Sequence, residues 1–361
     1  MARPSAERMA MSPANLVQKP RRSDRFLDAL DAAERVVFIS HVQPDPDSLG
    51  SMWGLSQLVQ DRLGLPTVLT QDGGIFRAEN RAFVDLLHLE LLPVSKYVRR
   101  TGDALVMVDS QPGTGRHSNN ALGTMTAVID HHVTPGQLDG VPFTDIRPDL
   151  GATCTLVTKY LVEQRSNIPP KLATALLYGI ETELSGFPRE GTAADDDALA
   201  HLFPLAEKDL LAQIRHARLP KSHFEVLAMA LRNAAVFDRV AFAWVDALVQ
   251  PEQAAEVVDF LIRYEHIDWA ICAGVHGQRV VLSARAARSN ARAGELLREA
   301  VGDLGNAGGH ERRAGGCVVL NDVTSTSLDR LRQELTRRCV RAFGASSAIP
   351  SPLVPTSASR K

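Results

Sequence analysis

Short apolar runs alternate with amphipathic stretches between Val36 and about Phe187, and this alternation predicts strands separated by helices. The runs expected to be buried strands are VVFIS (36–40), PTVLT (66–70), ALVMVD (104–109) and TAVID (126–130). The stretches expected to be helices are SLGSMWGLSQLVQDRL (48–63), RAENRAFVDLLHL (77–89), TCTLVTKYLVEQ (153–164) and ATALLYGIE (173–181). This order predicts an α/β fold, a parallel sheet with helices on both faces.

A second, smaller α/β unit is predicted between Val240 and about Ala342. Its expected strands are RVAFAWVDA (239–247), WAICAGV (269–275) and RVVLSAR (279–285), and its expected helices cover 254–264 and 327–343. The predicted organisation is a disordered leader (1–22), a first domain (23–190), a helical connector (191–235), a second domain (236–345) and a disordered tail (346–361).

Composition narrows the class of protein. The chain of 361 residues is 45% hydrophobic and 23% charged, which is typical of a globular protein. Its formal net charge of -2 argues against non-specific electrostatic binding of long duplex DNA. No apolar run approaches the roughly 20 residues of a membrane span, and no apolar stretch follows the basic N-terminus as in a secretory signal. The four cysteines form no CxxC pair, so reduced thiols and a cytoplasmic location are expected.

Candidate chemistry begins with His41, Asp45 and Asp47 in SHVQPDPDSLGS (40–51), between a predicted strand and a predicted helix. In parallel α/β sheets, ligands bind beyond the carboxyl ends of the strands, so these side chains lie where a site is expected. The alternative is a solvated Asp-Pro turn in which an Asp or Ser caps the next helix.

Asp109 ends the third predicted strand, and Asp130, His131 and His132 end the fourth. A lone Asp after an apolar strand is commonly a turn residue, but here three strands end in carboxylates or imidazoles. Oxygen and imidazole donors without thiolates suit Mn²⁺, with Mg²⁺, Co²⁺ or Fe²⁺ as alternatives. So many acids need more than one cation, and a pair of ions bridged by a carboxylate could activate water and hold a phosphoryl oxygen.

The ordered set HVQPDPD (41–47), VD (108–109), DHH (130–132) and GGHERRAGG (308–316) resembles the DHH phosphoesterase superfamily, in the branch with a DHHA1 C-terminal domain. Among its members, the two-domain layout is most similar to bacterial oligoribonuclease/adenosine-bisphosphate phosphatases. The resemblance implies a catalytic first domain and a substrate-binding second domain.

The resemblance also implies a role for each strand-end residue. His41 and Asp45 would hold one metal ion, Asp47 and His131 the other, and Asp109 would bridge the two. Asp130 would orient the second ion's shell, and His132 would reach the substrate phosphate. These last three roles make Asp109, Asp130 and His132 the expected catalytic residues.

One segment departs from the family pattern. Family members usually carry a further metal-binding Asp in a GIxTDT-like segment, whereas this chain has GIETEL (179–184), with Glu183 in the place of the Asp. A Glu still offers carboxylate oxygens but reaches one methylene further, so the geometry around the second ion is expected to differ.

The second domain is expected to recognise the substrate. The glycines allow close approach of the backbone to a ligand, and arginine forks suit phosphate oxygens. The predicted clamp consists of Gly308, Gly309, His310, Arg285, Arg288, Arg312 and Arg313. The alternative is that about half of these arginines only solvate the surface.

The expected function is hydrolysis of short oligoribonucleotides, cyclic or linear dinucleotides, or nucleotide phosphates, with two divalent ions, preferably Mn²⁺, as cofactors. A nucleotide or short RNA is the expected partner, with no membrane and no long duplex DNA; a homodimer is compatible with this prediction. Three alternatives stay open: an inorganic pyrophosphatase or polyphosphatase of the same superfamily, a nucleotide-binding regulator that has lost its activity, and an exonuclease acting on long DNA.

Overall fold

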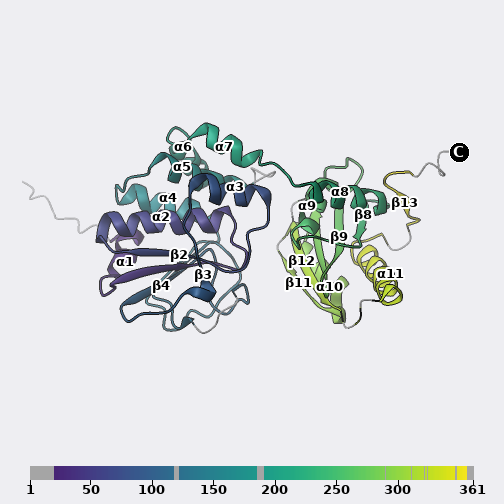
Figure 1. Cartoon of the computed structure of the whole chain (residues 1–361), viewed down its shortest axis with the longest axis horizontal. Coiled ribbons are helices and arrows are strands. Elements are labelled where there is room, and N and C mark those ends of the chain that lie inside the picture. The colour runs from purple at the N-terminus through teal and green to yellow at the C-terminus, as the bar shows by residue number, and fades with distance from the viewer. Residues whose placement is uncertain are drawn as a thin grey trace, which may run out of the picture. The chain divides into compact units, whose positions relative to one another are not determined.

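The computed structural model describes residues 20–117, 122–184, 191–288, 290–309, 311–320, 322, 324–345 and 348–355 (Figure 1). The chain divides into two compact units, Met1–Ile75 with Glu79–Ala217 and Phe76–Ala78 with Arg218–Lys361. No helix in the described ranges is both long and apolar enough to span a membrane.

The first unit contains a sheet of six parallel strands in the order β3-β2-β1-β4-β5-β6, so the predicted parallel α/β architecture is confirmed. Its strands are β1 (Arg35–Ile39), β2 (Thr67–Gln71), β3 (Leu92–Pro93), β4 (Asp103–Val108), β5 (Ala127–Asp130) and β6 (Phe143–Ile146). Its helices are α1 (Arg22–Asp28), α2 (Pro46–Leu63), α3 (Ala78–Leu87), η1 (Val94–Lys96), α4 (Thr153–Glu163), α5 (Pro170–Leu184), α6 (Ala193–Leu202) and α7 (Lys208–Arg215).

Alternate residues of the central strands enter two hydrophobic clusters. Val36 and Phe38 of β1 pack with the apolar faces of α1 to α7 in the larger cluster. Val37 and Ile39 face the opposite way, where the cluster is completed by loop residues such as Leu122 and Met125. This period of two is the pattern expected of a strand that is buried on both faces.

The second unit contains a seven-stranded sheet in the order β11-β12-β10-β9-β8-β7-β13, in which only β8 and β9 pair in parallel. Its strands are β7 (Ala235–Phe237), β8 (Val240–Val245), β9 (Trp269–His276), β10 (Arg279–Ala286), β11 (Asn306–Gly309), β12 (Arg313–Val319) and β13 (Ser351–Pro352). Its helices are α8 (Lys221–Asn233), α9 (Gln253–Leu261), α10 (Ala293–Val301), η4 (Gly302–Leu304) and α11 (Ser325–Ala342).

Several helices and strands were not predicted from the sequence. In the first unit these are α1, β3 and β6, and in the second they are α10, β7 and the strands β11, β12 and β13. The segment expected to be a connector, 191–235, contains α6 and α7, which lie in the first unit, and α8, which lies in the second. Most of the missed strands are short or rich in glycine, and neither kind shows a clear period of two.

Candidate active site

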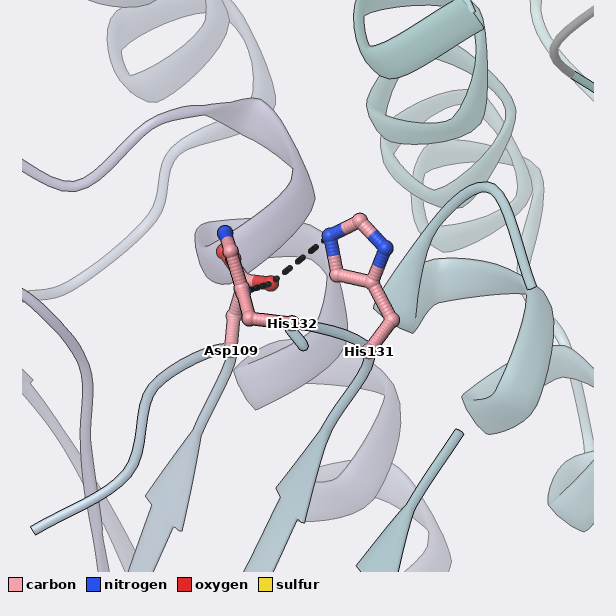
Figure 2. A group of neighbouring side chains, drawn as sticks. All are labelled: Asp109, His131 and His132. Carbon is pink, nitrogen blue, oxygen red and sulfur yellow. Dashed lines mark ion pairs between the residues drawn. The ribbon is translucent and has the colours of Figure 1, made fainter. Parts of the chain in front are cut away.

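The register of the parallel strands brings the predicted residues to one edge of the sheet. Ile39 of β1 pairs with Met107 of β4, so His41 and Asp109, each two residues further on, stand at the same level. Val108 pairs with Ile129 of β5, which puts Asp109 beside Asp130. Figure 2 shows Asp109, His131 and His132 converging at these strand ends. Asp109 has a φ of 56°, a left-handed conformation that costs most non-glycine residues about 1–2 kcal/mol but that Asp tolerates comparatively well.

His41 faces two carboxylates. Its Nε2 lies 3.6 Å from Oδ2 of Asp45 and 3.5 Å from Oδ2 of Asp109. Its Nδ1 lies 2.9 Å from the carbonyl oxygen of Val42, an acceptor that fixes the proton on Nδ1 and leaves Nε2 facing the acids. Burial lowers the pKa of His41, but Asp45 and Asp109 outweigh it and raise the pKa to about 10.

Asp45 is the helix cap that the sequence offered as an alternative for this loop, and it also lies beside His41. It is the N-cap of α2, and its Oδ1 accepts a hydrogen bond from the backbone N–H of Ser48 at 3.0 Å. Its other oxygen is the one near His41. Helix capping therefore fixes the carboxylate while leaving one oxygen available to a cation.

Asp47 is fully buried and is held from the opposite side of the site. Its two oxygens accept the backbone N–H groups of Thr153 and Cys154, at 2.8 and 2.7 Å, which begin α4. Its Oδ2 lies 3.8 Å from Nε2 of His131. Burial and the nearby charge of Asp109 raise the pKa of Asp47 well above its usual range, so the ionised form needs a cation close by.

The turn at 150–154 positions three of the predicted ligands. The carbonyl oxygen of Leu150 lies 3.2 Å from Nδ1 of His131, and Thr153 Oγ1 donates to Oδ1 of Asp109 at 2.8 Å, in addition to the contacts with Asp47. Nε2 of His131 is thereby directed at Oδ1 of Asp109, 3.6 Å away. Burial lowers the pKa of His131, while Asp109 and Asp47 raise it to about 9.

Glu183 approaches this group from α5. The helix comes close to α2 at Gly179, where an added Cβ would lie 2.9 Å from the carbonyl oxygen of Pro46. Glu183 lies one turn further along the same face, and its charge acts on the pKa values of both Asp47 and His131. Glu183 therefore lies close enough to contribute charge to the site.

His132 belongs to a separate chain of hydrogen bonds. Its Nδ1 lies 2.8 Å from Oδ1 of Asp130, whose Oδ2 accepts from the side-chain amide of Gln111 at 2.8 Å. Its Nε2 faces the guanidinium of Arg116 at 2.8 Å. Asp130 thus orients His132, whereas Leu150 supplies the acceptor for His131.

Sequence reasoning missed Gln111, Arg116 and Thr153. None of these residues belongs to the quoted motifs, and their contacts join segments that are distant in the chain, such as Thr153 and Asp109. The sequence could have indicated Gln111 and Arg116 only by their position, because both lie in the loop that follows β4 and Asp109.

The four predicted arginines of the second unit lie in different environments. Arg312 is 5% exposed and donates to the carbonyl oxygens of Ala286 and Ala287, so it ties the backbone together. Arg288 is exposed and pairs with Asp268 at 3.0 Å. Arg285 and Arg313 are paired neighbours on β10 and β12, and Arg285 also forms an ion pair of 2.6 Å with Asp259.

The predicted glycines differ as well. Gly308 pairs with Gly315 across β11 and β12, and an added Cβ on Gly308 would meet no atom within 4 Å. Gly309 has a φ of 150° and lies against Gly294 of α10. The two backbones are so close that a Cβ added to Gly294 would lie 2.4 Å from the carbonyl oxygen of Gly309. Only Gly308 therefore leaves open space for a ligand, and His310 lies outside the described residues.

Residues 35–180 match the DHH family, N-terminal domain, and this range contains every strand-end residue described above. This range is similar to the N-terminal domain of the DHH family. The expected resemblance to that family is thereby confirmed for residues 35–180.

Three curated relatives are similar to this chain. An uncharacterized protein of Methanocaldococcus jannaschii is 29% identical over 308 residues, which is 85% of this chain and 63% of the relative. The bifunctional oligoribonuclease and PAP phosphatase NrnA of Mycoplasma genitalium is 24% identical over 55% of this chain and 65% of its own length. A probable manganese-dependent inorganic pyrophosphatase of Lactococcus lactis is 24% identical over 41% of this chain and 48% of the relative. The chain thus spans about half to two thirds of the length of these relatives.

A solved structure supports the fold of both units. The crystal structure of an exopolyphosphatase-related protein from Bacteroides fragilis superposes with a TM-score of 0.71 at 17% identity, covering 89% of this chain and 97% of that one. At this identity the likeness concerns the fold alone.

Proposed function

We propose that the chain is a metal-dependent phosphoesterase that hydrolyses short oligoribonucleotides or nucleotide phosphates. The observation that carries the proposal is the shared position of Asp109, whose carboxylate lies in two candidate metal groups, one with His41 and Asp45 and one with His131 and His132. The DHH-family match and the activity named for the Mycoplasma relative support the same class of reaction.

The residues fit a pair of divalent ions. Nε2 of His41 and Nε2 of His131 are buried polar atoms without a hydrogen-bond partner among the described residues, and both face carboxylates. Such atoms are costly unless a ligand satisfies them. In this proposal His41 and Asp45 would hold one ion, Asp47, His131 and Glu183 would hold the other, and Asp109 would contribute to both. Nδ1 of His132 already faces Asp130, so His132 is assigned to the substrate.

The donors are oxygens and imidazole nitrogens, which favours Mn²⁺. The buried thiol of Cys154 is not a donor in the proposal, because its Sγ lies 3.3 Å from the carbonyl oxygen of Asp47 and its pKa is raised by burial. The Lactococcus relative, which is named as manganese-dependent, supports the choice of metal. When bound, the ions would neutralise the carboxylates, lower the pKa of a bound water and polarise the phosphoryl group.

The chain's own residues orient the reactants. Asp130 and Gln111 fix the imidazole of His132 with its Nε2 away from them, so this nitrogen is placed to contact a phosphoryl oxygen. The turn at 150–154 holds Asp47, Asp109 and His131 from one side, and the cap of α2 holds Asp45 from the other. This fixed arrangement reduces the reorganisation needed at the phosphate.

For the substrate, we propose that the second unit is a DHHA1 domain that binds the nucleotide along β11 and β12. Open space at Gly308 and the neighbouring arginines Arg285 and Arg313 support this assignment. His310, two residues after Gly308 and outside the described residues, is the remaining residue of the clamp predicted from the sequence. Arg288 and Arg312 have partners of their own and support the domain rather than the ligand.

An inorganic pyrophosphatase is the second candidate, favoured by the Lactococcus relative. That similarity covers 151 residues, against 217 for the Mycoplasma relative, so the nucleotide-directed enzyme aligns with more of the chain.

A substrate panel tests the proposal. The protein is assayed with Mn²⁺ on an RNA dinucleotide, adenosine 3′,5′-bisphosphate, pyrophosphate and a long DNA strand, with a chelator as the metal control. The proposal predicts chelator-sensitive turnover that is at least tenfold faster on one of the nucleotide substrates than on pyrophosphate or long DNA. Preference for pyrophosphate would establish the second candidate, and no turnover at all would refute the phosphoesterase assignment.

A further inference from the structure

Arg116 lies at the edge of the metal-ligand cluster and is attached to it at two points. Its Nη1 lies 2.8 Å from Nε2 of His132, and its carbonyl oxygen accepts the backbone N–H of Val42 at 2.5 Å. Val42 follows His41, and His132 follows β5. The loop that carries Arg116 therefore contacts the segment after β1 and the segment after β5. The guanidinium therefore lies beside the candidate catalytic imidazole, and one backbone hydrogen bond ties its loop to the end of β1.

The partner of this guanidinium is unusual for the first unit. Arg35 forms a two-point pair with Asp103, and Arg147 does the same with Asp149. In the described part of the chain, Arg116 has no carboxylate within ion-pair distance, and its acceptor is an imidazole nitrogen. A guanidinium carries five N–H donors in a planar fork, so most of its capacity and its full charge are available to an anion.

The carboxylates of the site outnumber the positive charges that two divalent ions would bring. Asp45, Asp47, Asp109, Asp130 and Glu183 contribute five carboxylates. Two divalent ions would supply four positive charges, which leaves a net negative charge facing an anionic substrate. A further cation beside the site would reduce the repulsion of a phosphate, and Arg116 is exposed and lies beside His132.

We propose that Arg116 is a substrate-binding residue that donates charge-assisted hydrogen bonds to a non-bridging oxygen of the substrate's phosphate. The inference rests on the proposed function, and it adds a phosphate-binding side chain supplied by the DHH domain itself. Because Nη1 already touches His132, one phosphate oxygen can contact both side chains after a small movement of the guanidinium. The competing explanation is that Arg116 only holds the imidazole of His132 in place.

The test uses the full-length variants Arg116→Ala and Arg116→Lys, with Arg62→Ala as the matched control. Arg62 is an exposed arginine in the last turn of α2, the helix that begins at the site. Inorganic phosphate is titrated by calorimetry into each protein loaded with stoichiometric Mn²⁺, and kcat and KM are measured on the best substrate of the panel. Mn²⁺ affinity is measured separately for every variant.

We expect Arg116→Ala to bind phosphate about 10- to 100-fold more weakly, the range for losing charge-assisted hydrogen bonds, and to lose kcat/KM by a similar factor. Added guanidinium ion should restore part of the loss, Arg116→Lys should fall between, and Mn²⁺ affinity and the Arg62→Ala variant should stay within twofold of the wild type. Unchanged phosphate affinity in Arg116→Ala would overturn the inference, as would a loss of Mn²⁺ affinity as large as the loss of phosphate affinity. If the wild type turned over no substrate, the proposed function would fail, and the phosphate titration would still decide the role of Arg116.

Discussion

Replacing Thr153 by Val removes one hydroxyl from the centre of the site and nearly nothing else. Thr153 Oγ1 donates to Oδ1 of Asp109 at 2.8 Å, while its backbone N–H donates to Asp47. Valine has almost the same shape, and its backbone can still donate to Asp47. The change therefore isolates the hydrogen bond that orients the carboxylate shared by both candidate metal groups.

The expected size of the effect follows from this contact. The lost hydrogen bond has a charged acceptor and is buried, so it contributes about 1.5–3 kcal/mol, partly as stability and partly as orientation of Asp109. Partners that orient metal ligands typically change metal affinity or activity by about 10–100-fold. We expect Thr153→Val to remain folded, with Mn²⁺ affinity and kcat/KM reduced within that range, and Thr153→Ser to keep most of both.

Calorimetric titration of Mn²⁺, urea unfolding and turnover on the same preparations separate these effects. The serine variant is the control, because it retains the hydroxyl and loses only a methyl group. If Thr153→Val binds Mn²⁺ and turns over like the wild type, the inference that Thr153 positions Asp109 is refuted. Equal losses in the valine and serine variants would instead point to packing.

Three further predictions concern other parts of the first unit. Glu183→Ala should weaken the second Mn²⁺ site by about tenfold or more while Glu183→Asp retains part of the affinity; equal calorimetric affinity in both variants and the wild type would exclude Glu183 as a ligand. Asp195 is fully buried and accepts the N–H of Gly151 at 3.0 Å, so Asp195→Ala should lower the free energy of unfolding by about 3 kcal/mol in a urea titration, and a loss below about 1 kcal/mol would count against this role. Hydrogen bonds from Arg35 hold the pKa of Asp103 below its usual range, so their stabilisation is complete above about pH 4 and lost as the pH falls further; Asp103→Asn should therefore flatten the acid side of a stability-against-pH curve, and an unchanged curve would contradict the assignment.

The positions of the candidate ligands could be predicted because they depend on simple rules. Strands of a parallel sheet share their carboxyl edge, so residues that follow β1, β4 and β5 must meet there, and the apolar runs located those strands to within one or two residues. The structure brings His41, Asp109 and His131 together at this edge, and their roles as metal ligands stay a prediction.

The support around the ligands could not be predicted in the same way. Thr153, Leu150 and Arg116 act through contacts between distant segments, and a hydroxyl, a carbonyl or an exposed arginine carries no distinctive pattern in the sequence. The contact of Asp47 with the start of α4 likewise depends on packing between distant segments, whereas the local cap at Asp45 was among the alternatives for this loop.

In the second unit, local preference opposed the observed structure. Gly308 of β11 and Gly315 of β12 lie in paired strands although glycine is unfavourable there. The sheet determines their conformation, because β12 pairs with β10 and β11 pairs with β12. Helix α10 starts after Arg292, which has a φ of 55° and provides no side-chain cap, so its beginning carried no recognisable signal.

Counting bound Mn²⁺ in the wild type and in Asp109→Asn tests the central claim most directly. Asparagine keeps the size of the side chain and tolerates the left-handed backbone at this position, but it removes the charge shared by the two groups. Calorimetry should give two Mn²⁺ ions per wild-type chain and at most one weakly bound ion in the folded variant, with loss of turnover. Two ions of unchanged affinity in Asp109→Asn, or a single ion in the wild type, would contradict the shared-carboxylate site.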